Sequence, residues 1–322
     1  MEKLKFKNSP TLVKVIYISF FVFFFVFAFV YIYPMAWAFI NSLKTGNEYT
    51  TNSIALPTSW GVWNTYKVNI TVFGFTWSGE AIKLPVPIGN YFEVFSTFRI
   101  TSQTRGDFYY FDMLFNSLWI LVVHVAVNVL SSMLLAYALA RFRFPGKNFL
   151  YSVVIFANTI PIIGSGPAAY KLAMNLQMVN NPAIIWLMWA SGFDFAFIVF
   201  YGYFKGISAS YSESAKMDGA NNLTILFSVI LPQIIPCLVA IAITQAIGIW
   251  NNYSISMVYM RDYPNLAYGM YVFQSNKFVA GLTNPMPSYF AAAVISCIPI
   301  IILYASTQNL ILTNMTTGGL KG

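Results

Sequence analysis

The stretch KGISASYSESAKMDGANN, residues 205–222, is polar and separates two apolar runs, Ala183–Phe204 and Leu226–Ile249. A helix that crosses the hydrocarbon core of a bilayer needs about 20 mostly apolar residues. Both runs reach that length. The sequence around residue 205 therefore predicts two membrane-spanning helices joined by a short polar loop.

The polar stretch carries its own helix signals. Ser210 and Glu213 have the spacing of a capping box, which predicts a helix that begins at the residue after Ser210. Gly219 is well placed to end that helix. Asn221 or Asn222 can then cap a second helix that runs into the membrane. We therefore expect a short helix outside the bilayer between two spans.

Other apolar runs outside this pair also reach membrane-spanning length. They are Val13–Phe39, Leu114–Ala140, Leu150–Leu172 and Ser288–Leu312. The run Leu150–Leu172 is interrupted by Pro161, Gly164, Gly166 and Pro167, and such residues are tolerated at membrane depth only where protein surrounds them. It therefore predicts a broken helix inside the bundle. The predicted fold class is an all-α integral membrane protein with six transmembrane helices.

The composition excludes several classes of protein. Of 322 residues, 58% are hydrophobic and 9% are charged, against about 25% charged in soluble domains. The net charge of +8 comes from basic residues placed between apolar runs, unlike the single basic face of a nucleic-acid binder. Cys237 and Cys297 lie in apolar runs without ligand partners, so no disulfide or metal site is expected. No Gly-rich phosphate motif occurs, which predicts no ATPase chemistry and no cofactor.

The basic residues are distributed unevenly about the predicted spans. Ten fall on one side: Lys3, Lys5, Lys7, Lys14, Arg141, Arg143, Lys147, Lys205, Lys216 and Lys321. Of the basic residues in the other short segments, only Lys171, Arg261 and Lys277 fall on the other side. The five in the long segment 41–113 are left out of this count, because long loops translocate with little regard to charge. Because short cytoplasmic loops are enriched in Lys and Arg, we expect a multi-pass protein of the cell membrane with both termini in the cytoplasm.

The long segment 41–113 is expected to be an extracellular insertion between spans one and two. Its stretch Tyr66–Leu84 alternates β-forming and polar residues and contains Ser78-Gly79, which predicts a hairpin turning there. No repeat or charged linker divides the chain. We expect one transmembrane domain over residues 1–322, containing this insertion and the loop 205–222.

The loop and the following run resemble a known family. Glu213-Ser-Ala215, three residues, Gly219, nine residues and Val229-Ile-Leu231-Pro232 are similar to the signature Glu-Ala-Ala, three, Gly, nine, Ile, one, Leu-Pro. That signature marks the inner-membrane permeases of binding-protein-dependent ABC importers. Ser214 and Val229 depart from it.

Further stretches resemble the carbohydrate branch of that family, the maltose-type second permease subunit. They are Asp218-Gly219-Ala220, Pro236, Asn116–Leu118, Ala136–Lys147, Trp250–Tyr253 and Gly318–Gly322. The resemblance covers most of the chain from Asn116 onward. The insertion 41–113 is longer than the family leads us to expect.

The resemblance implies a mechanism and partners. The loop would dock on a separate ATPase through Glu213, Ala215, Asp218 and Gly219. The partners would be a homologous permease forming a heterodimer, two ATP-binding subunits and an extracytoplasmic substrate-binding protein, and the cargo an oligosaccharide or related sugar. Without the resemblance, an ordinary cytoplasmic loop explains the same residues equally well.

Five residues are candidates for the substrate path. Asp194 lies in the fourth run, where a carboxylate is costly to bury; it either lines the path or sits at a boundary beside a polar neighbour. Asn158 and Ser165 flank the interruption of the third run, which is typical of substrate-binding broken helices and equally of a structural kink. Trp250, an aromatic ring that could stack on a sugar, and Asn251 complete the set.

Other functions stay open at this stage. An importer of an amino acid, peptide or phosphate would share the coupling signature. A secondary transporter would show inverted repeats and several intramembrane charges, and neither is evident. An intramembrane enzyme needs a recurring constellation of catalytic groups. His124, with Asn128 one turn later, is better explained as an interhelical hydrogen-bond partner, so no catalytic residue is predicted.

Overall fold

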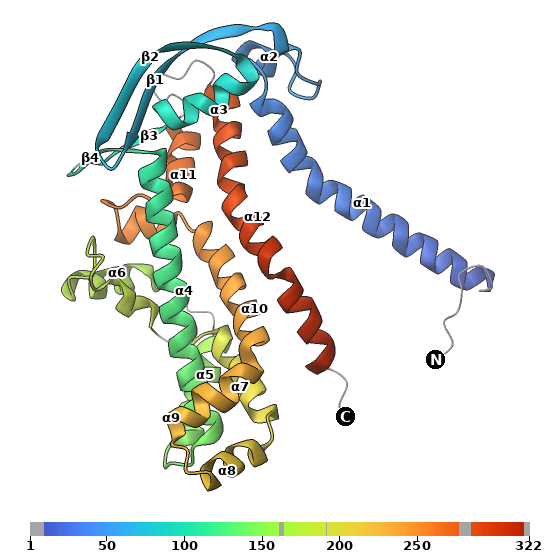
Figure 1. Ribbon diagram of the computed structural model, residues 1–322, viewed down its shortest axis with the longest axis vertical. Helices are drawn as coiled ribbons and strands as arrows, with labels where there is room; N and C mark the ends of the chain where they lie inside the picture. Colours follow the sequence, from blue (N-terminus) through green and yellow to red (C-terminus); the bar gives the residue numbers. More distant parts are fainter. Residues whose placement is uncertain (1–9, 103, 161–163, 191, 277–284, 319–322) are drawn as a thin grey trace. The chain divides into compact units, whose positions relative to one another are not determined.

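The computed structural model describes residues 10–102, 104–160, 164–190, 192–276 and 285–318. Pro161, Lys277, the lysines before residue 10 and the end of the tail after Gly318 lie outside them. Contacts divide the chain into two compact units, the first formed by Met1–Phe98 with Asn276–Ile295 and the second by Arg99–Ser275 with Ser296–Gly322 (Figure 1). The helix α12, Pro285–Gly318, begins in the first unit and continues in the second.

The first unit begins with a long helix and continues with a small α/β region. The long helix is α1 Thr11–Ser42. The α/β region consists of α2 Gly46–Thr51, the 3₁₀ turn η2 Ser59–Gly61, β1 Trp63–Val72, β2 Phe75–Pro85 and α3 Val86–Thr97. The apolar window of α1 has no buried residue, and its aromatic rings contact one another at helical spacing, as Phe20 and Phe24 do with centroids 6.3 Å apart. The surface of α1 therefore suits contact with lipid.

Polar groups tie the end of α1 to α3. The Asn90 amide donates to the carbonyl oxygens of Ser42 and Lys44, each at 2.8 Å. The hydroxyls of Ser42 and Tyr91 are 2.7 Å apart. The last carbonyls of a helix have no partner within the helix, so these bonds hold the end of the predicted first span against the insertion.

The predicted hairpin forms, but its turn is elsewhere. β1 and β2 pair antiparallel around Phe73 and Gly74, whose φ angles of 51° and 80° are both left-handed. The predicted turn at Ser78-Gly79 is wrong, because Ser78 lies within β2 opposite Asn69. A two-residue hairpin turn needs positive φ at its central positions, and glycine supplies one without strain. Sequence alternation identified the strands, whereas the first Gly after β1 set the turn.

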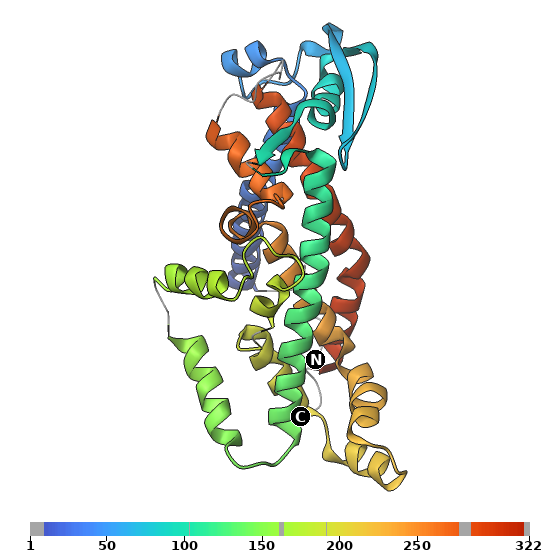
Figure 2. The same cartoon turned by 90° about the vertical axis from the view of Figure 1, so that its left-hand side faces the viewer.

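The second unit is a helical bundle with a small sheet at one end. Its elements are β3 Arg99–Ser102, β4 Gly106–Tyr109, α4 Tyr110–Arg141, α5 Lys147–Thr159, α6 Gly166–Asn175, the 3₁₀ turn η3 Ile185–Trp189, α7 Phe195–Gly206, α8 Ala209–Met217, α9 Asn222–Thr224, the π-helical stretch η4 Ile225–Ile230, α10 Leu231–Trp250, a second π-helical stretch η5 Ile255–Tyr259 and α11 Leu266–Asn276. The helices α4, α7 and α10 run side by side, and α8 lies at the end of the bundle where α4 ends (Figures 1 and 2).

The core of this bundle is apolar and continuous across three helices. Its fully buried members include Met133 and Leu139 of α4, Phe197, Phe200 and Phe204 of α7, and Ile230 and Ile234 near the start of α10. The π-helical stretch precedes Pro232, which cannot donate a backbone hydrogen bond. A wider turn at this point lets the helix continue from Asn222 to Trp250.

Helices of membrane-spanning length agree with most of the predicted runs. In the described residues they are Thr11–Ser42, Tyr110–Arg141, Asn222–Trp250 and Pro285–Gln308. The third run contains two short helices, α5 and α6. In the fourth run the α-helix begins only at Phe195 and not at Ala183, because Asp194 caps it there. The protein is mostly helical with long apolar helices, and the six crossings remain a prediction.

Candidate functional site

The predicted loop helix exists as α8, but it begins earlier than predicted. It spans Ala209–Met217, and its first turn is capped by Ser208, whose hydroxyl accepts from the Ser210 N–H at 3.3 Å. The predicted cap at Ser210 is therefore wrong. Ser210 is itself inside the helix, and its hydroxyl is 2.8 Å from that of Ser208. Two serines at this spacing satisfy a cap pattern at either position, and the earlier one forms the cap.

The end of α8 follows the predicted pattern closely. The Ala220 N–H donates to the Ala215 carbonyl at 2.9 Å, and the Gly219 N–H donates to the Lys216 carbonyl at 3.0 Å. Together they form a Schellman motif, whose C-terminal residue is left-handed. Gly219 has φ +82°. The next helix is capped by Asn221, whose side chain accepts from the Thr224 N–H at 2.8 Å.

The predicted coupling residues lie on this short element with different exposures. Glu213, Asp218 and Gly219 are exposed. Ala215 is partly buried and packs against the bundle core together with Ala220. A Cβ added to Gly219 would meet nothing within 4 Å, so any penalty for a side chain comes from its backbone conformation. The loop therefore consists of a short, capped, mostly exposed helix that packs against the bundle core through Ala215 and Ala220.

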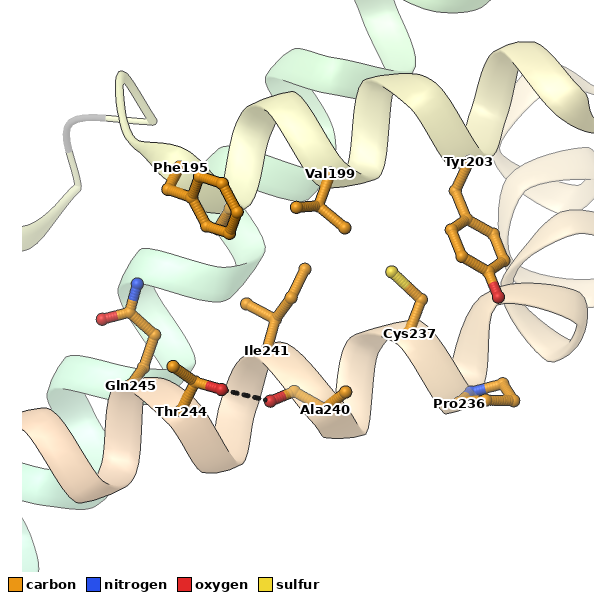
Figure 3. A pocket seen from close by; sticks show the side chains of 10 residues that line it. Phe195, Val199, Tyr203, Pro236, Cys237, Ala240, Ile241, Thr244 and Gln245 are labelled. Carbon is orange, nitrogen blue, oxygen red and sulfur yellow. Dashed lines mark hydrogen bonds between the residues drawn. The ribbon is translucent and has the colours of Figure 1, made fainter. Parts of the chain in front are cut away.

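A groove of about 260 Å³ lies between α7 and α10 (Figure 3). It is lined by Phe195, Ala196, Val199, Tyr203, Pro236, Cys237, Ala240, Ile241, Thr244 and Gln245. Most of these residues are apolar. Polar groups mark its ends, with Gln245 beside Phe195 at one end and the Tyr203 hydroxyl at the other (Figure 3). The Thr244 hydroxyl is already used, since it donates to the Ala240 carbonyl at 2.9 Å.

Asp194 caps α7 beside this groove. Its Oδ1 accepts from the Phe197 N–H at 3.1 Å and from the Ser132 hydroxyl of α4 at 2.8 Å. Its Oδ2 is buried and has no hydrogen-bond partner among the described residues. A carboxylate at a helix N-terminus also favours the helix dipole. Asp194 thus joins α4 to α7 through Oδ1, while its Oδ2 is buried and unpaired among the described residues.

A polar stripe on α4 continues from Ser132. Asn128 donates to the Trp189 carbonyl at 3.5 Å, and the His124 ring lies edge-on to Trp189 with centroids 5.2 Å apart. His124, Asn128 and Ser132 recur every four residues, so they share one face of the helix. The groove helix α10 also packs against α4. The stripe therefore places polar groups where α4 meets the chain before α7 and the groove helix α10.

The other candidate path residues lie apart from the groove. Asn158 and Ser165 are exposed, and the Asn158 amide bonds back to the Val154 carbonyl of its own helix at 2.9 Å. Trp250 is 6% exposed, and its indole N–H donates to the Ser296 carbonyl of α12 at 3.1 Å. Asn251 is exposed and bonds back to Ile247. These five candidates do not converge on one cavity.

The groove residues were missed by the sequence reasoning, although a signal was present. Phe195, Val199 and Tyr203 recur every four residues, as do Cys237, Ile241 and Gln245. Such spacing places each set on one helix face. A polar Thr244-Gln245 pair within an apolar run marked that face. No group of three or more His, Cys, Asp or Glu side chains in the described chain is arranged to hold a metal.

Comparison with known proteins gives one family match. The model described as "Binding-protein-dependent transport system inner membrane component" matches residues 129–316. The arabinooligosaccharides transport system permease protein AraQ of Halalkalibacterium halodurans is 30% identical over 213 residues, covering 64% of this chain and 73% of the relative. The diacetylchitobiose uptake system permease protein NgcG of Streptomyces coelicolor is 24% identical over 290 residues, covering 89% and 83%.

A solved structure shares the fold. It is a bacterial ABC transporter involved in the import of the acidic polysaccharide alginate, and one of its chains matches with a TM-score of 0.73 at 24% identity. The match covers 94% of this chain and 98% of that chain. The likeness therefore extends over nearly the whole length of both chains.

Proposed function

The chain belongs to the family of binding-protein-dependent transport system inner membrane components, and from this premise we propose that it carries an oligosaccharide or related sugar into the cell. The family predicted from the signature around Glu213 and Gly219 is confirmed by the match. The protein is a multi-pass permease subunit and a transport component rather than an enzyme. It works with a separate ATPase and with a substrate-binding protein.

We propose that α8 is the coupling helix that receives the ATPase. The observation that carries this proposal is the Schellman end of α8, with Gly219 at φ +82° and the two alanine contacts to the bundle core. A force applied to a rigid, capped helix passes to whatever that helix packs against. Here that is the core between α4, α7 and α10. Glu213 and Asp218 are exposed on α8 or at its end and supply polar docking contacts.

The assembly proposed around this subunit has a homologous permease as its heterodimer partner and two ATP-binding subunits. The proposed domain is the whole chain, with the loop 205–222 in the cytoplasm and the insertion 41–113 outside, where it would meet the substrate-binding protein. Both termini would be cytoplasmic. The uneven distribution of Lys and Arg supports this orientation, since short cytoplasmic loops are enriched in them.

The proposed pathway uses the groove between α7 and α10 together with the chain that precedes α7. Asp194 keeps one oxygen without a partner among the described residues, and Gln245 is half-buried at the groove end. Both can exchange hydrogen bonds with sugar hydroxyls. Asn158, Ser165, Trp250 and Asn251 would act outside the groove. The names of the relatives, which refer to arabinooligosaccharides and diacetylchitobiose, support a saccharide cargo.

The coupling role is tested by Gly219→Val and Glu213→Ala in the assembled transporter. A β-branched residue is strained at positive φ, so Gly219→Val should distort the turn. Glu213→Ala should remove a docking contact and leave the spans unchanged. We expect normal membrane insertion, weaker co-purification of the ATPase or uncoupled hydrolysis, and lower transport, with Gly219→Val the more severe. Wild-type coupling in Gly219→Val would remove α8 as the coupling helix.

The cargo needs a separate test. Binding of labelled oligosaccharides, amino acids and phosphate to the purified transporter with its binding protein should show saturable binding of a saccharide alone. Saturable binding of an amino acid or phosphate instead would keep the importer and replace its cargo. Uptake that stops when the proton gradient collapses, while ATP remains high, would point to a secondary transporter.

A further inference from the structure

A second hollow lies between the last turn of α4 and α8, outside the groove described above. Its volume is about 240 Å³. Residues of both elements line it, among them Tyr137 and Arg141 of α4 and Ser212 and Lys216 of α8. We call it the basic hollow, because of the charges gathered there.

The basic hollow carries a net positive charge. Arg141, Arg143 and Lys216 line it, and Glu213 is the one acidic residue among its lining groups. None of the three basic groups forms an ion pair with Glu213 within 4.0 Å; the ion pair found among the described residues joins Arg99 to Asp107 elsewhere. Positive charge collected in a concave site raises the local concentration of anions.

Two hydrogen-bond donors of residues lining the basic hollow have no partner in the described part of the chain. The Arg141 guanidinium is anchored by Nη2, which donates to the Ile207 carbonyl at 2.9 Å. Its Nε is buried without a partner among the described residues, and so is the hydroxyl of Ser212. A buried donor left unpaired destabilises the fold. Both groups belong to residues that line the hollow, so a ligand with oxygen acceptors seated there would offer them partners.

We propose that the basic hollow binds the phosphate group of an anionic phospholipid and so ties α8 to the end of α4. The proposal rests on the cytoplasmic placement of α8 proposed above. α4 has membrane-spanning length and ends here at Arg141, which puts the hollow at headgroup depth. Basic pockets between transmembrane helices on the cytoplasmic side are a recognised form of lipid-headgroup site.

The depth of the hollow favours a lipid phosphate over a carboxylate from the ATPase. A phosphodiester has unesterified oxygens that can accept from Arg141 Nε and from the Ser212 hydroxyl together, and charge-assisted bonds of this kind are the strong ones. The hollow reaches inward to Tyr137, which is 7% exposed, and so extends toward the depth of the lipid chains. A bound lipid would then link membrane composition to the position of the coupling helix.

The test uses the whole transporter in nanodiscs that contain phosphatidylglycerol or only phosphatidylcholine. Native mass spectrometry counts the lipids retained, and the mass of each adduct separates a lipid from inorganic phosphate added to the phosphatidylcholine sample. Arg143→Gln removes an exposed charge of the hollow, and Ser212→Asp adds a negative one; neither touches the Arg141 bond to Ile207. Lys205→Gln is the matched control, since Lys205 is basic and does not line the hollow.

We expect retained phosphatidylglycerol in wild type and in Lys205→Gln. Each of the other variants should bind it about fivefold more weakly, which is the contribution of one basic residue near a membrane surface. Equal retention in all four proteins would overturn the site. Phosphate adducts without lipid adducts would overturn the lipid as the source. Retention that appears only after the ATPase is removed would assign the hollow to an ATPase side chain. Because the readout is lipid mass, it is independent of coupling, and failure of the Gly219 experiment would leave it interpretable.

Discussion

The loop around α8 and the groove beside α7 are built in different ways. α8 has no buried residue, and its ends are held by hydrogen bonds between residues close in sequence. The groove is formed by two helices, and the cap at its edge, Asp194, bonds to Ser132, which is 62 residues away. Changes in α8 should therefore alter coupling with little effect on folding. Changes at the Asp194 cap should act first on the stability of the bundle.

The largest effect is expected at Asp194. Asp194→Ala removes the cap of α7, worth about 1 kcal/mol, and leaves the buried Ser132 hydroxyl unpaired, which costs about 1–3 kcal/mol. We expect a lower melting temperature of the detergent-solubilised transporter and less folded permease. Asp194→Asn keeps the accepting oxygen and should retain most of the stability. Equal melting temperatures for Asp194→Ala and wild type would mean that this cap does not hold α4 and α7 together.

A graded series at Gly219 should separate coupling from stability. Left-handed backbone costs an ordinary residue about 1–2 kcal/mol, while asparagine tolerates it better. The loss of transport per ATP hydrolysed should therefore be largest for Gly219→Val, intermediate for Gly219→Ala and smallest for Gly219→Asn. Melting temperatures should stay close to wild type in all three. Gly206→Ala is the control, because Gly206 lies within α7 with open space around it and no positive φ. An unordered series would show that backbone strain at 219 is not what coupling senses.

Filling the groove should reduce transport without disturbing the association of the ATPase, whereas a change in α8 should disturb coupling to the ATPase. Ala240→Phe places a ring in the space between α7 and α10 while a control, Ile235→Phe, adds bulk at an exposed position outside the lining. We expect a stability change within about 1 kcal/mol for both, normal ATPase association, and reduced transport in Ala240→Phe alone. Full transport in that variant would exclude the groove from the pathway.

The smallest effect concerns the start of α8. Ser208→Ala should lose the observed cap, whose replacement costs about 0.5–1 kcal/mol in an exposed helix. Ser210→Ala removes the residue that the capping-box pattern named. Hydrogen exchange of the amides in the first turn of α8 should speed up more in Ser208→Ala than in Ser210→Ala. The opposite ranking would restore the capping box.

The parts of this fold that follow from nearby residues could be predicted, and those that depend on packing could not. The end of α8 at Gly219 and a cap at Asn221 or Asn222 were predicted because all their partners lie within a few residues. The hairpin turn was misplaced because two glycines fit the same alternating stretch, and only pairing of β1 with β2 distinguishes them. The start of α7 at Phe195 was missed, since an apolar run does not reveal that Asp194 bonds to a serine on another helix. The groove could not be predicted because the four-residue spacing within α7 or α10 does not show that these two faces lie opposite each other.

The π-helical stretch Ile225–Ile230 is a point at which this long apolar helix can lose one residue and still continue as a helix. A π-turn holds one residue more than an α-turn in the same axial space, so a single deletion here can be absorbed by tightening the turn. The same deletion between Cys237 and Ala240 would rotate every later residue by about 100° and carry Gln245 away from α7. The groove residues of α10 keep facing α7 because the π-helical stretch, where the change in length is absorbed, precedes α10.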